Sequence, residues 1–172
     1  MRGPVGVLMV LALCGLSVGC GDDGDGGSGD GPQDGGSSET VSTSSWVSAA
    51  DDACAKAYGE IEAPSAAVTG PTTADELSDA ESWLGSTTAT LEGLVEELDD
   101  MAQPSDADAA DEANGVVDAL GKALSALRAT RQAAADGDVG AYGTAFTTYT
   151  DDLAAYAQAA STAGLTECAK TP

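Results

Sequence analysis

The 172-residue chain contains no histidine, and its four cysteines form no Cys-x-x-Cys pair. The absence of histidine excludes Ser-His-Asp and Cys-His nucleophile systems, histidine-ligated haem and the Glu-x-x-His ligands of di-iron bundles. The absence of a Cys-x-x-Cys pair leaves no basis for a zinc-ribbon or thioredoxin-type site. We therefore expect a protein that is not an enzyme and that has no catalytic residues, resident cofactor or metal site.

Positive charge is also scarce, because the chain has 29 acidic residues and only six lysines and arginines. All 29 acids and five of the six basic residues follow Cys20, so the chain after that residue carries a net charge of −24. Such a chain is a poor partner for nucleic acid and anionic lipid headgroups, and we expect no nucleic-acid binding. The acidity is typical of solvated helix faces, and it can also attract cations or basic partners.

The first twenty residues have the organisation of an export signal. Arg2 precedes an apolar run, residues 5–18, which is too short to cross the roughly 30 Å of bilayer hydrocarbon as a mature helix. The run ends in Leu-Ser-Val-Gly-Cys at residues 16–20, which resembles the lipobox of bacterial lipoproteins, with serine where that family usually has leucine. The resemblance implies a signal peptide of residues 1–19, acylation of Cys20, and a lipid anchor that holds the protein to the bacterial cell membrane on its extracytoplasmic side. The alternative is a plain secretory signal, which would leave Cys20 as an ordinary thiol.

Residues 20–45 contain the lipidated cysteine and a segment of glycine, serine, aspartate and threonine with hardly an apolar side chain. This composition cannot bury enough surface to offset the entropy of ordering, so it predicts a disordered tether. A calcium site built from Asp22, Asp23, Asp25 and Asp30 is an alternative. Counted from Asp23, however, the segment lacks the glycine and the glutamate that an EF-hand loop has at its sixth and twelfth positions.

Residues 46–172 form the predicted folded domain. Apolar residues recur there at three- and four-residue steps, which predicts four helices over about 46–62, 73–102, 105–136 and 138–164. Thr73 with Glu76, Ser105 with Asp108, and Asp138 are the expected N-terminal caps. The fold class is thus all-α, an antiparallel up-down-up-down four-helix bundle with residues 63–72 as its longest loop. The clearest stripe is that of the second helix: Leu77, Ala80, Leu84, Thr87, Leu91, Leu94, Leu98 and Met101.

Glycines inside these helices predict that the helices approach closely, and a ligand cavity left by the missing side-chain volume is the alternative. They are Gly85, Gly93, Gly115, Gly121 and Gly143.

Cys54 and Cys168 remain as a pair once Cys14 is removed with the signal and Cys20 is acylated. Two such thiols are expected to be oxidised outside the cytoplasm. The up-down-up-down topology brings the first helix and the end of the fourth together, so we predict a disulfide that staples the bundle. In the chain-entropy model, closing so long a loop stabilises the fold by about 4 to 5 kcal/mol.

The arrangement of four alanine-rich helices, with a first cysteine in ACAKAYGEI and a second in GLTECAK, resembles that of small secreted proteins and lipoproteins of high-GC bacteria. The resemblance covers most of residues 46–170. It implies the same helical architecture and no particular activity.

Three surfaces are candidates for recognition. An acidic cluster (Glu96, Glu97, Asp99 and Asp100) at the end of the second helix could bind divalent cations weakly or be a solvated turn. The 63–72 loop together with Arg128 and Arg131 could form a binding surface, unless the arginines only pair with neighbouring acids. Trp83 and the tyrosine row of the last helix could line a ligand groove, although their positions are equally those of core residues.

The function that fits these observations is that of a membrane-anchored extracytoplasmic lipoprotein acting as a non-enzymatic binding module. Its partner would be a protein or a small molecule whose identity the sequence does not indicate. The alternative is an acidic structural protein of the envelope that binds divalent cations weakly.

Acylation of Cys20 is directly testable. Cells expressing the wild-type chain should incorporate labelled palmitate into the protein, and the Cys20→Ala variant should not. Equal labelling of the two, or no labelling of the wild type, would remove the lipid anchor.

Overall fold

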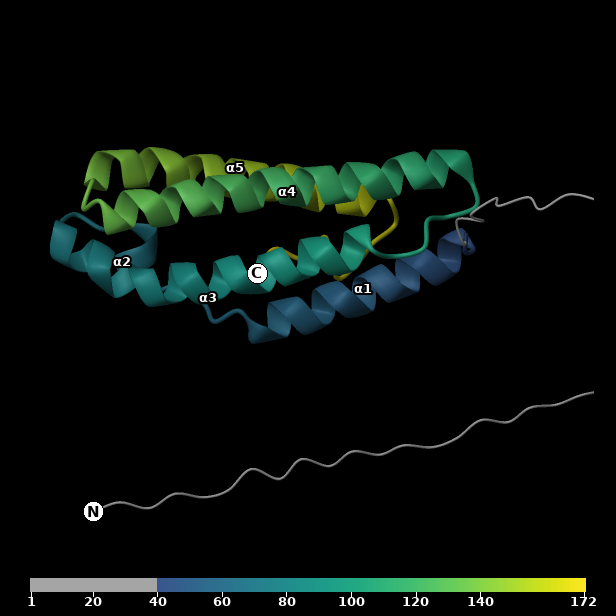
Figure 1. The fold of residues 1–172 in the computed structure, drawn as a ribbon, viewed down its shortest axis with the longest axis horizontal. Helices are drawn as coiled ribbons and strands as arrows, with labels where there is room; N and C mark the ends of the chain where they lie inside the picture. Colours follow the sequence, from purple (N-terminus) through teal and green to yellow (C-terminus); the bar gives the residue numbers. More distant parts are fainter. Residues whose placement is uncertain (1–39) are drawn as a thin grey trace, which may run out of the picture. The chain divides into compact units, whose positions relative to one another are not determined.

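The computed structural model describes residues 40–172, which form an all-helical unit. Its five helices are α1 (Thr43–Glu60), α2 (Ala66–Thr69), α3 (Ala74–Asp99), α4 (Ala107–Ala135) and α5 (Val139–Thr162), and no strand occurs in this range (Figure 1). The predicted all-α class is confirmed. The predicted signal peptide, Cys20, the calcium alternative and most of the 20–45 tether lie outside the described residues.

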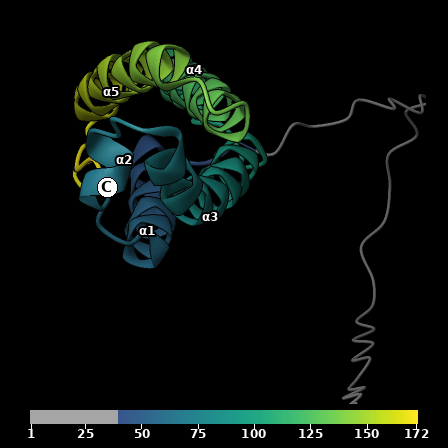
Figure 2. The same cartoon turned by 90° about the vertical axis from the view of Figure 1, so that its left-hand side faces the viewer.

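The long helices are arranged in two layers. α4 packs along α5 and α3, whereas α1 packs mainly against α3. Seen end-on, α4 and α5 form one layer, and α1 and α3 form the other (Figure 2). The short helix α2 lies beside α3.

The first helix begins at Thr43, three residues earlier than the Trp46 expected from its apolar stripe. The reason is polar: the Ser42 hydroxyl accepts a hydrogen bond from the backbone N–H of Ser45 at 3.1 Å and caps the helix. Just before it, the Val41 N–H donates to the Gln103 carbonyl at 3.0 Å, and the Ser105 N–H donates to the Val41 carbonyl at 2.8 Å. These bonds fix the start of α1 to the connection between α3 and α4.

Two of the three predicted caps are confirmed. Thr73 and Glu76 form a reciprocal capping box at the start of α3, and the Asp138 carboxylate accepts from the Ala141 N–H at 2.9 Å at the start of α5. The predicted pairing of Ser105 with Asp108 is wrong, because Asp106 caps α4 by accepting from the Ala109 N–H at 3.0 Å. The backbone of Ser105 is instead engaged with Val41.

The apolar stripes form the core as the periodicity predicts. Seven of the eight residues of the α3 stripe are buried, and Met101, which follows the helix, is partly buried. The single polar residue of that stripe, Thr87, is 1% exposed, and its hydroxyl has no hydrogen-bond partner. Within residues 40–172, no helix combines the length and apolarity that crossing a membrane requires. The buried stripe of α5 consists of Tyr142, Tyr149, Leu153, Tyr156 and Ala160.

The 63–72 segment is not the open loop expected from its proline and glycine content. It contains the single-turn helix α2, in which Val68 is fully buried. The carbonyl of Val68 accepts a hydrogen bond from the Tyr142 hydroxyl of α5 at 2.7 Å. Val68 is therefore a core residue and is not available for surface recognition.

The interior glycines of the helices do not mark close helix approach, so that prediction is wrong. A Cβ atom placed on Gly85, Gly93, Gly115, Gly121 or Gly143 would meet no atom within 4 Å. These positions face open space at the surface. By contrast, Gly137 and Gly164 end α4 and α5 with φ values of +69° and +80°, a backbone conformation that L-residues rarely adopt.

The two kinds of glycine should respond oppositely to alanine. Gly143→Ala should raise the free energy of unfolding by about 0.5 to 1 kcal/mol, because alanine favours the helix and nothing obstructs its methyl group. Gly137→Ala should lower it by about 1 to 2 kcal/mol because of its positive φ. Urea unfolding measures both. Destabilisation by Gly143→Ala would show that this position is not open.

Candidate functional site

A groove with aromatic walls lies where α3, α5, the α1–α3 connection and the C-terminal segment meet. We call it the aromatic groove, and its volume is about 340 Å³. No acidic or basic side chain is among the residues that line it: Pro64, Thr69, Trp83, Phe146, Tyr149, Thr150, Leu153, Ala154, Thr171 and Pro172. Of the residues that the sequence suggested for a ligand groove, Trp83 and Tyr149 line this one, whereas Tyr142 and Tyr156 are not in its lining.

One wall of the groove comes from α5 and follows from residue spacing. Tyr142, Tyr149 and Tyr156 recur every seven residues, close to two helical turns, so they share the buried face of α5. Phe146 lies between the first two, with its ring centroid 5.9 Å from that of Tyr142 and 5.9 Å from that of Tyr149. The sequence has only one phenylalanine and four tyrosines, and much of this small aromatic content is gathered here.

The opposite wall is held by Trp83 of α3. Its indole N–H donates to the Glu62 carbonyl at 2.7 Å, which ties the α1–α3 connection to α3. Two of the four wall hydroxyls are also engaged within the protein, since Thr150 donates to the Thr147 carbonyl at 2.8 Å and Thr69 donates to the Ser65 carbonyl at 3.4 Å. The groove therefore presents ring surfaces and methyl groups, and few uncommitted hydrogen-bond donors.

The tyrosines near the groove are not acid–base groups at neutral pH. Burial raises the pKa of Tyr149 to about 12, and the neighbouring Tyr58 adds to the effect. Burial likewise raises the pKa of Tyr142 to about 12. Both phenols remain neutral under physiological conditions, so they contribute ring surface rather than charge to the site.

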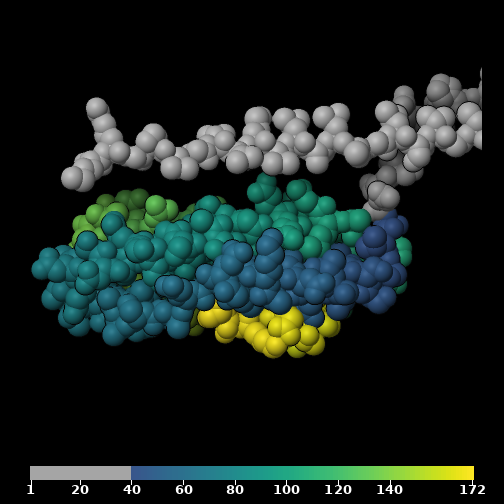
Figure 3. All heavy atoms as spheres, turned by 90° about the horizontal axis from the view of Figure 1, so that it is seen from below, coloured from purple at the N-terminus to yellow at the C-terminus, as the bar shows by residue number. Residues whose placement is uncertain are grey.

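The remaining wall belongs to the C-terminal segment, which turns back along α1 after α5. In the space-filling view this segment lies against α1 (Figure 3). The predicted disulfide is present: Cys54 and Cys168 are bonded, with their Cα atoms 5.0 Å apart and both residues fully buried. Cys54 is the twelfth of the 18 residues of α1, so the bond joins the chain end to the middle of the helix.

Asp51 fixes the same segment and was not identified from the sequence. Its carboxylate accepts hydrogen bonds from the backbone N–H groups of Thr166 at 3.0 Å, Glu167 at 2.8 Å and Cys168 at 3.3 Å. The Thr166 hydroxyl adds a fourth bond at 2.9 Å. Partial burial opposes ionisation, but these bonds together outweigh it and hold the pKa of Asp51 below its ordinary value of 3.8.

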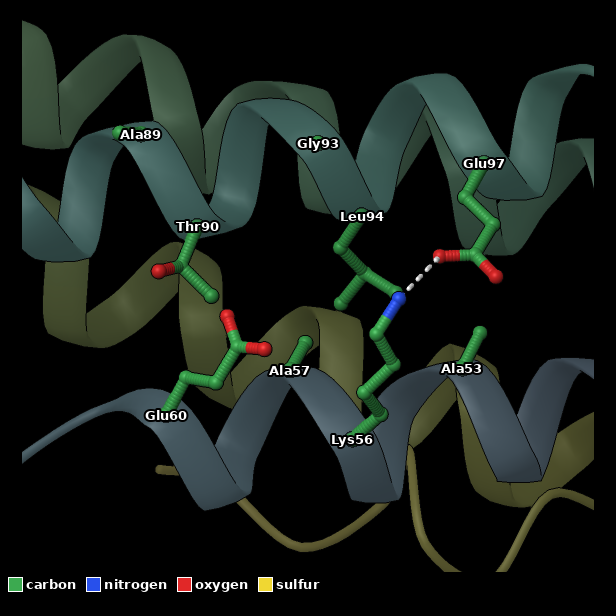
Figure 4. Close-up of a pocket in the computed structure, with 9 residues that line it drawn as sticks. All are labelled: Ala53, Lys56, Ala57, Glu60, Ala89, Thr90, Gly93, Leu94 and Glu97. Carbon is green, nitrogen blue, oxygen red and sulfur yellow. Dashed lines mark ion pairs between the residues drawn. The ribbon is translucent and has the colours of Figure 1, made fainter. Parts of the chain in front are cut away.

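The acidic cluster at the end of α3 does not assemble a metal site. Within residues 40–172, no three cysteine, aspartate or glutamate side chains are grouped so as to hold a metal ion. Glu97 instead lies 4.0 Å from Lys56 across a depression of about 190 Å³ between α1 and α3 (Figure 4). Both side chains are exposed, so this ion pair contributes little stability.

The arginines lie on a separate polar depression between α3 and α4. Arg128 pairs with Glu92, its Nη2 2.9 Å from the carboxylate, which agrees with the expectation that it pairs with a neighbouring acid. Arg131 lines the same depression. The aromatic groove, which Pro64 and Thr69 of the 63–72 segment help to line, shares no residue with this depression, so the two arginines are not part of the groove.

The bonds of Asp51 predict a pH-dependent contribution to stability. The folded-state pKa of Asp51 lies below its ordinary value of 3.8. The ionised carboxylate therefore stabilises the fold fully at pH values above the unfolded-state pKa, and this stabilisation is lost as the pH falls through the folded-state pKa. Asp51→Asn should lower the free energy of unfolding by roughly 1 kcal/mol at neutral pH, after allowance for solvent screening. The difference from wild type should shrink in strong acid.

Urea unfolding between pH 2 and 7 with the disulfide intact measures this difference. The control is Asp52→Asn at the adjacent exposed position. A wild-type to Asp51→Asn difference that does not change with pH would contradict a role for the carboxylate charge.

Comparison with known proteins adds no family to this description. No protein-family model, no curated protein and no solved structure matches the chain.

Proposed function

We propose that the protein is a lipid-anchored extracytoplasmic binding module, without enzymatic activity, whose recognition site for a small apolar molecule is the aromatic groove. The observation that carries the proposal is the grouping of Trp83, Phe146 and Tyr149 around about 340 Å³ of accessible space. A volume at the lower end of the range for ligand sites, lined by aromatic and aliphatic side chains, is typical of small-molecule recognition.

The extracytoplasmic location is supported by the disulfide between Cys54 and Cys168. Structural disulfides persist in oxidising compartments and are rare in the cytoplasm. Together with the resemblance of residues 16–20 to a lipobox, this favours export and acylation at Cys20. The glycine-rich segment after Cys20 would then act as the tether between the anchor and the helical unit.

We further propose that the four long helices form an antiparallel up-down-up-down bundle. Support comes from the order of residues across the α1–α3 depression: Ala53 stands at the same end as Glu97, and Glu60 stands at the same end as Thr90 (Figure 4). Numbers rise along α1 as they fall along α3. The reversal of chain direction at each connection between long helices in Figure 1 agrees with this arrangement.

Ligand binding by the groove can be tested with N-phenyl-1-naphthylamine, a neutral apolar dye whose emission rises in an apolar site. Wild-type protein should give a saturable increase in emission. Trp83→Ala should weaken binding about tenfold, because it removes one wall of the groove. Arg131→Ala, in the polar depression, is the matched control and should bind like wild type.

Circular dichroism and urea unfolding establish that each variant is folded, and Phe146→Ala supplies a second wall variant if Trp83→Ala is unstable. A non-saturable signal, or equal binding by the wall variants and the control, would exclude the groove as the ligand site.

A further inference from the structure

The chemistry left available in the aromatic groove limits what it can recognise. Trp83 Nε1 and the hydroxyls of Thr69 and Thr150 already donate to backbone carbonyls, and most of the other lining residues are aromatic or aliphatic, so a bound molecule meets a largely apolar surface. The face of an aromatic ring carries partial negative charge and attracts cations, most strongly for indole. Trp83 lines the groove and is partly exposed, and its indole N–H is already bonded to the Glu62 carbonyl, so this donor is not available to a ligand.

The net charge around the groove also favours a cationic ligand. Residues 40–172 contain 23 acidic and five basic side chains, a net charge of −18. Asp151 and Asp152 lie in sequence between the wall residues Thr150 and Leu153. The basic residue adjacent to the wall is Lys170, and it forms an ion pair with Glu167. An approaching anion is therefore repelled and a cation is concentrated.

We propose that the aromatic groove binds a small organic cation of the quaternary-ammonium type, with its cationic head against the rings of Trp83, Phe146 and Tyr149. This inference rests on the proposed function, since it specifies the ligand class of the same site. It follows from charge complementarity: a groove with no charged side chain in its lining, set in a strongly acidic domain, combines an apolar surface with a negative potential. A groove of about 340 Å³ also suits a compact head group better than a folded partner.

Choline and its neutral carbon isostere 3,3-dimethylbutan-1-ol form a matched pair that isolates the charge. The readout is the indole N–H signal of Trp83 in a ¹H–¹⁵N NMR spectrum, with the buried Trp46 as the internal reference. Choline should shift the Trp83 signal saturably and bind at least tenfold more tightly than the isostere. Its affinity should fall as ionic strength rises from about 0.01 to about 0.15 M, because screening shortens the reach of the acidic field.

A leucine substitution separates ring electrostatics from apolar contact. Phe146→Leu keeps an apolar side chain but removes one ring, so it should weaken choline binding several-fold while leaving binding of N-phenyl-1-naphthylamine nearly unchanged. Equal loss for the two probes would indicate damage to the groove rather than loss of a cation–ring contact, and would count against the proposal. Trp46→Phe is the control and should alter neither.

The outcomes distinguish the two proposals. Binding of the dye together with equal affinities for choline and its isostere, or with no choline binding, overturns the cation inference and leaves the apolar binding site in place. Failure of all three probes to bind overturns both. Saturable choline binding with the tenfold preference and the predicted salt dependence supports the organic-cation site.

Discussion

The covalent bond between Cys54 and Cys168 is the constraint on which the position of the C-terminal segment depends. Among the helices, α1 packs mainly against α3, and the buried residues of α1 include three alanines, Ala50, Ala53 and Ala57. Alanine buries little apolar surface, so these residues stabilise the contact only modestly. The disulfide adds an attachment that does not depend on buried area, and in the chain-entropy model it stabilises the fold by about 4 to 5 kcal/mol.

Hydrogen bonds also hold the C-terminal segment against α1. Asp51 accepts hydrogen bonds from three successive backbone N–H groups, and the Tyr58 hydroxyl donates to the Cys168 carbonyl at 3.3 Å. The chain direction is thereby set before it reaches Thr171 and Pro172, two wall residues of the aromatic groove. A site whose aromatic walls come from α3 and α5 thus depends on residues in the middle of α1.

Periodicity allowed the helices and their core faces to be predicted because each stripe is a local property. Spacing of three and four residues identifies the buried side of α3 whatever its neighbours are, and the Thr73–Glu76 capping box requires only adjacent turns. The disulfide was predictable because only two cysteines lie in the predicted folded domain and the expected topology brings them together. The role of Asp51 was not, since nothing in the sequence distinguishes it from Asp52, and its partners lie 115 to 117 residues away.

The predictions for the 63–72 segment and for the interior glycines were wrong because both depend on tertiary contacts. The 63–72 segment has the proline and glycine content of a loop. In the structure, however, Val68 is buried, and its carbonyl accepts a hydrogen bond from the Tyr142 hydroxyl of α5. Interior glycines suggested tight helix contacts, but they face open space. Residue spacing alone allowed Trp83 and the α5 aromatics to be either core residues or groove residues. Tyr149 is both, since it is only 4% exposed and also lines the groove.

The pairing of Cys54 with Cys168 also makes most of the domain a covalent ring. The two cysteines are 114 positions apart, and α3, α4, α5 and every connection between them lie inside the ring. One cut by a protease in an exposed turn, such as the one at Asp136, opens this ring without releasing a fragment. The severed helices remain tethered to α1 at high effective concentration and can re-pack. Only a second cut within the ring, or a cut outside it, separates part of the domain.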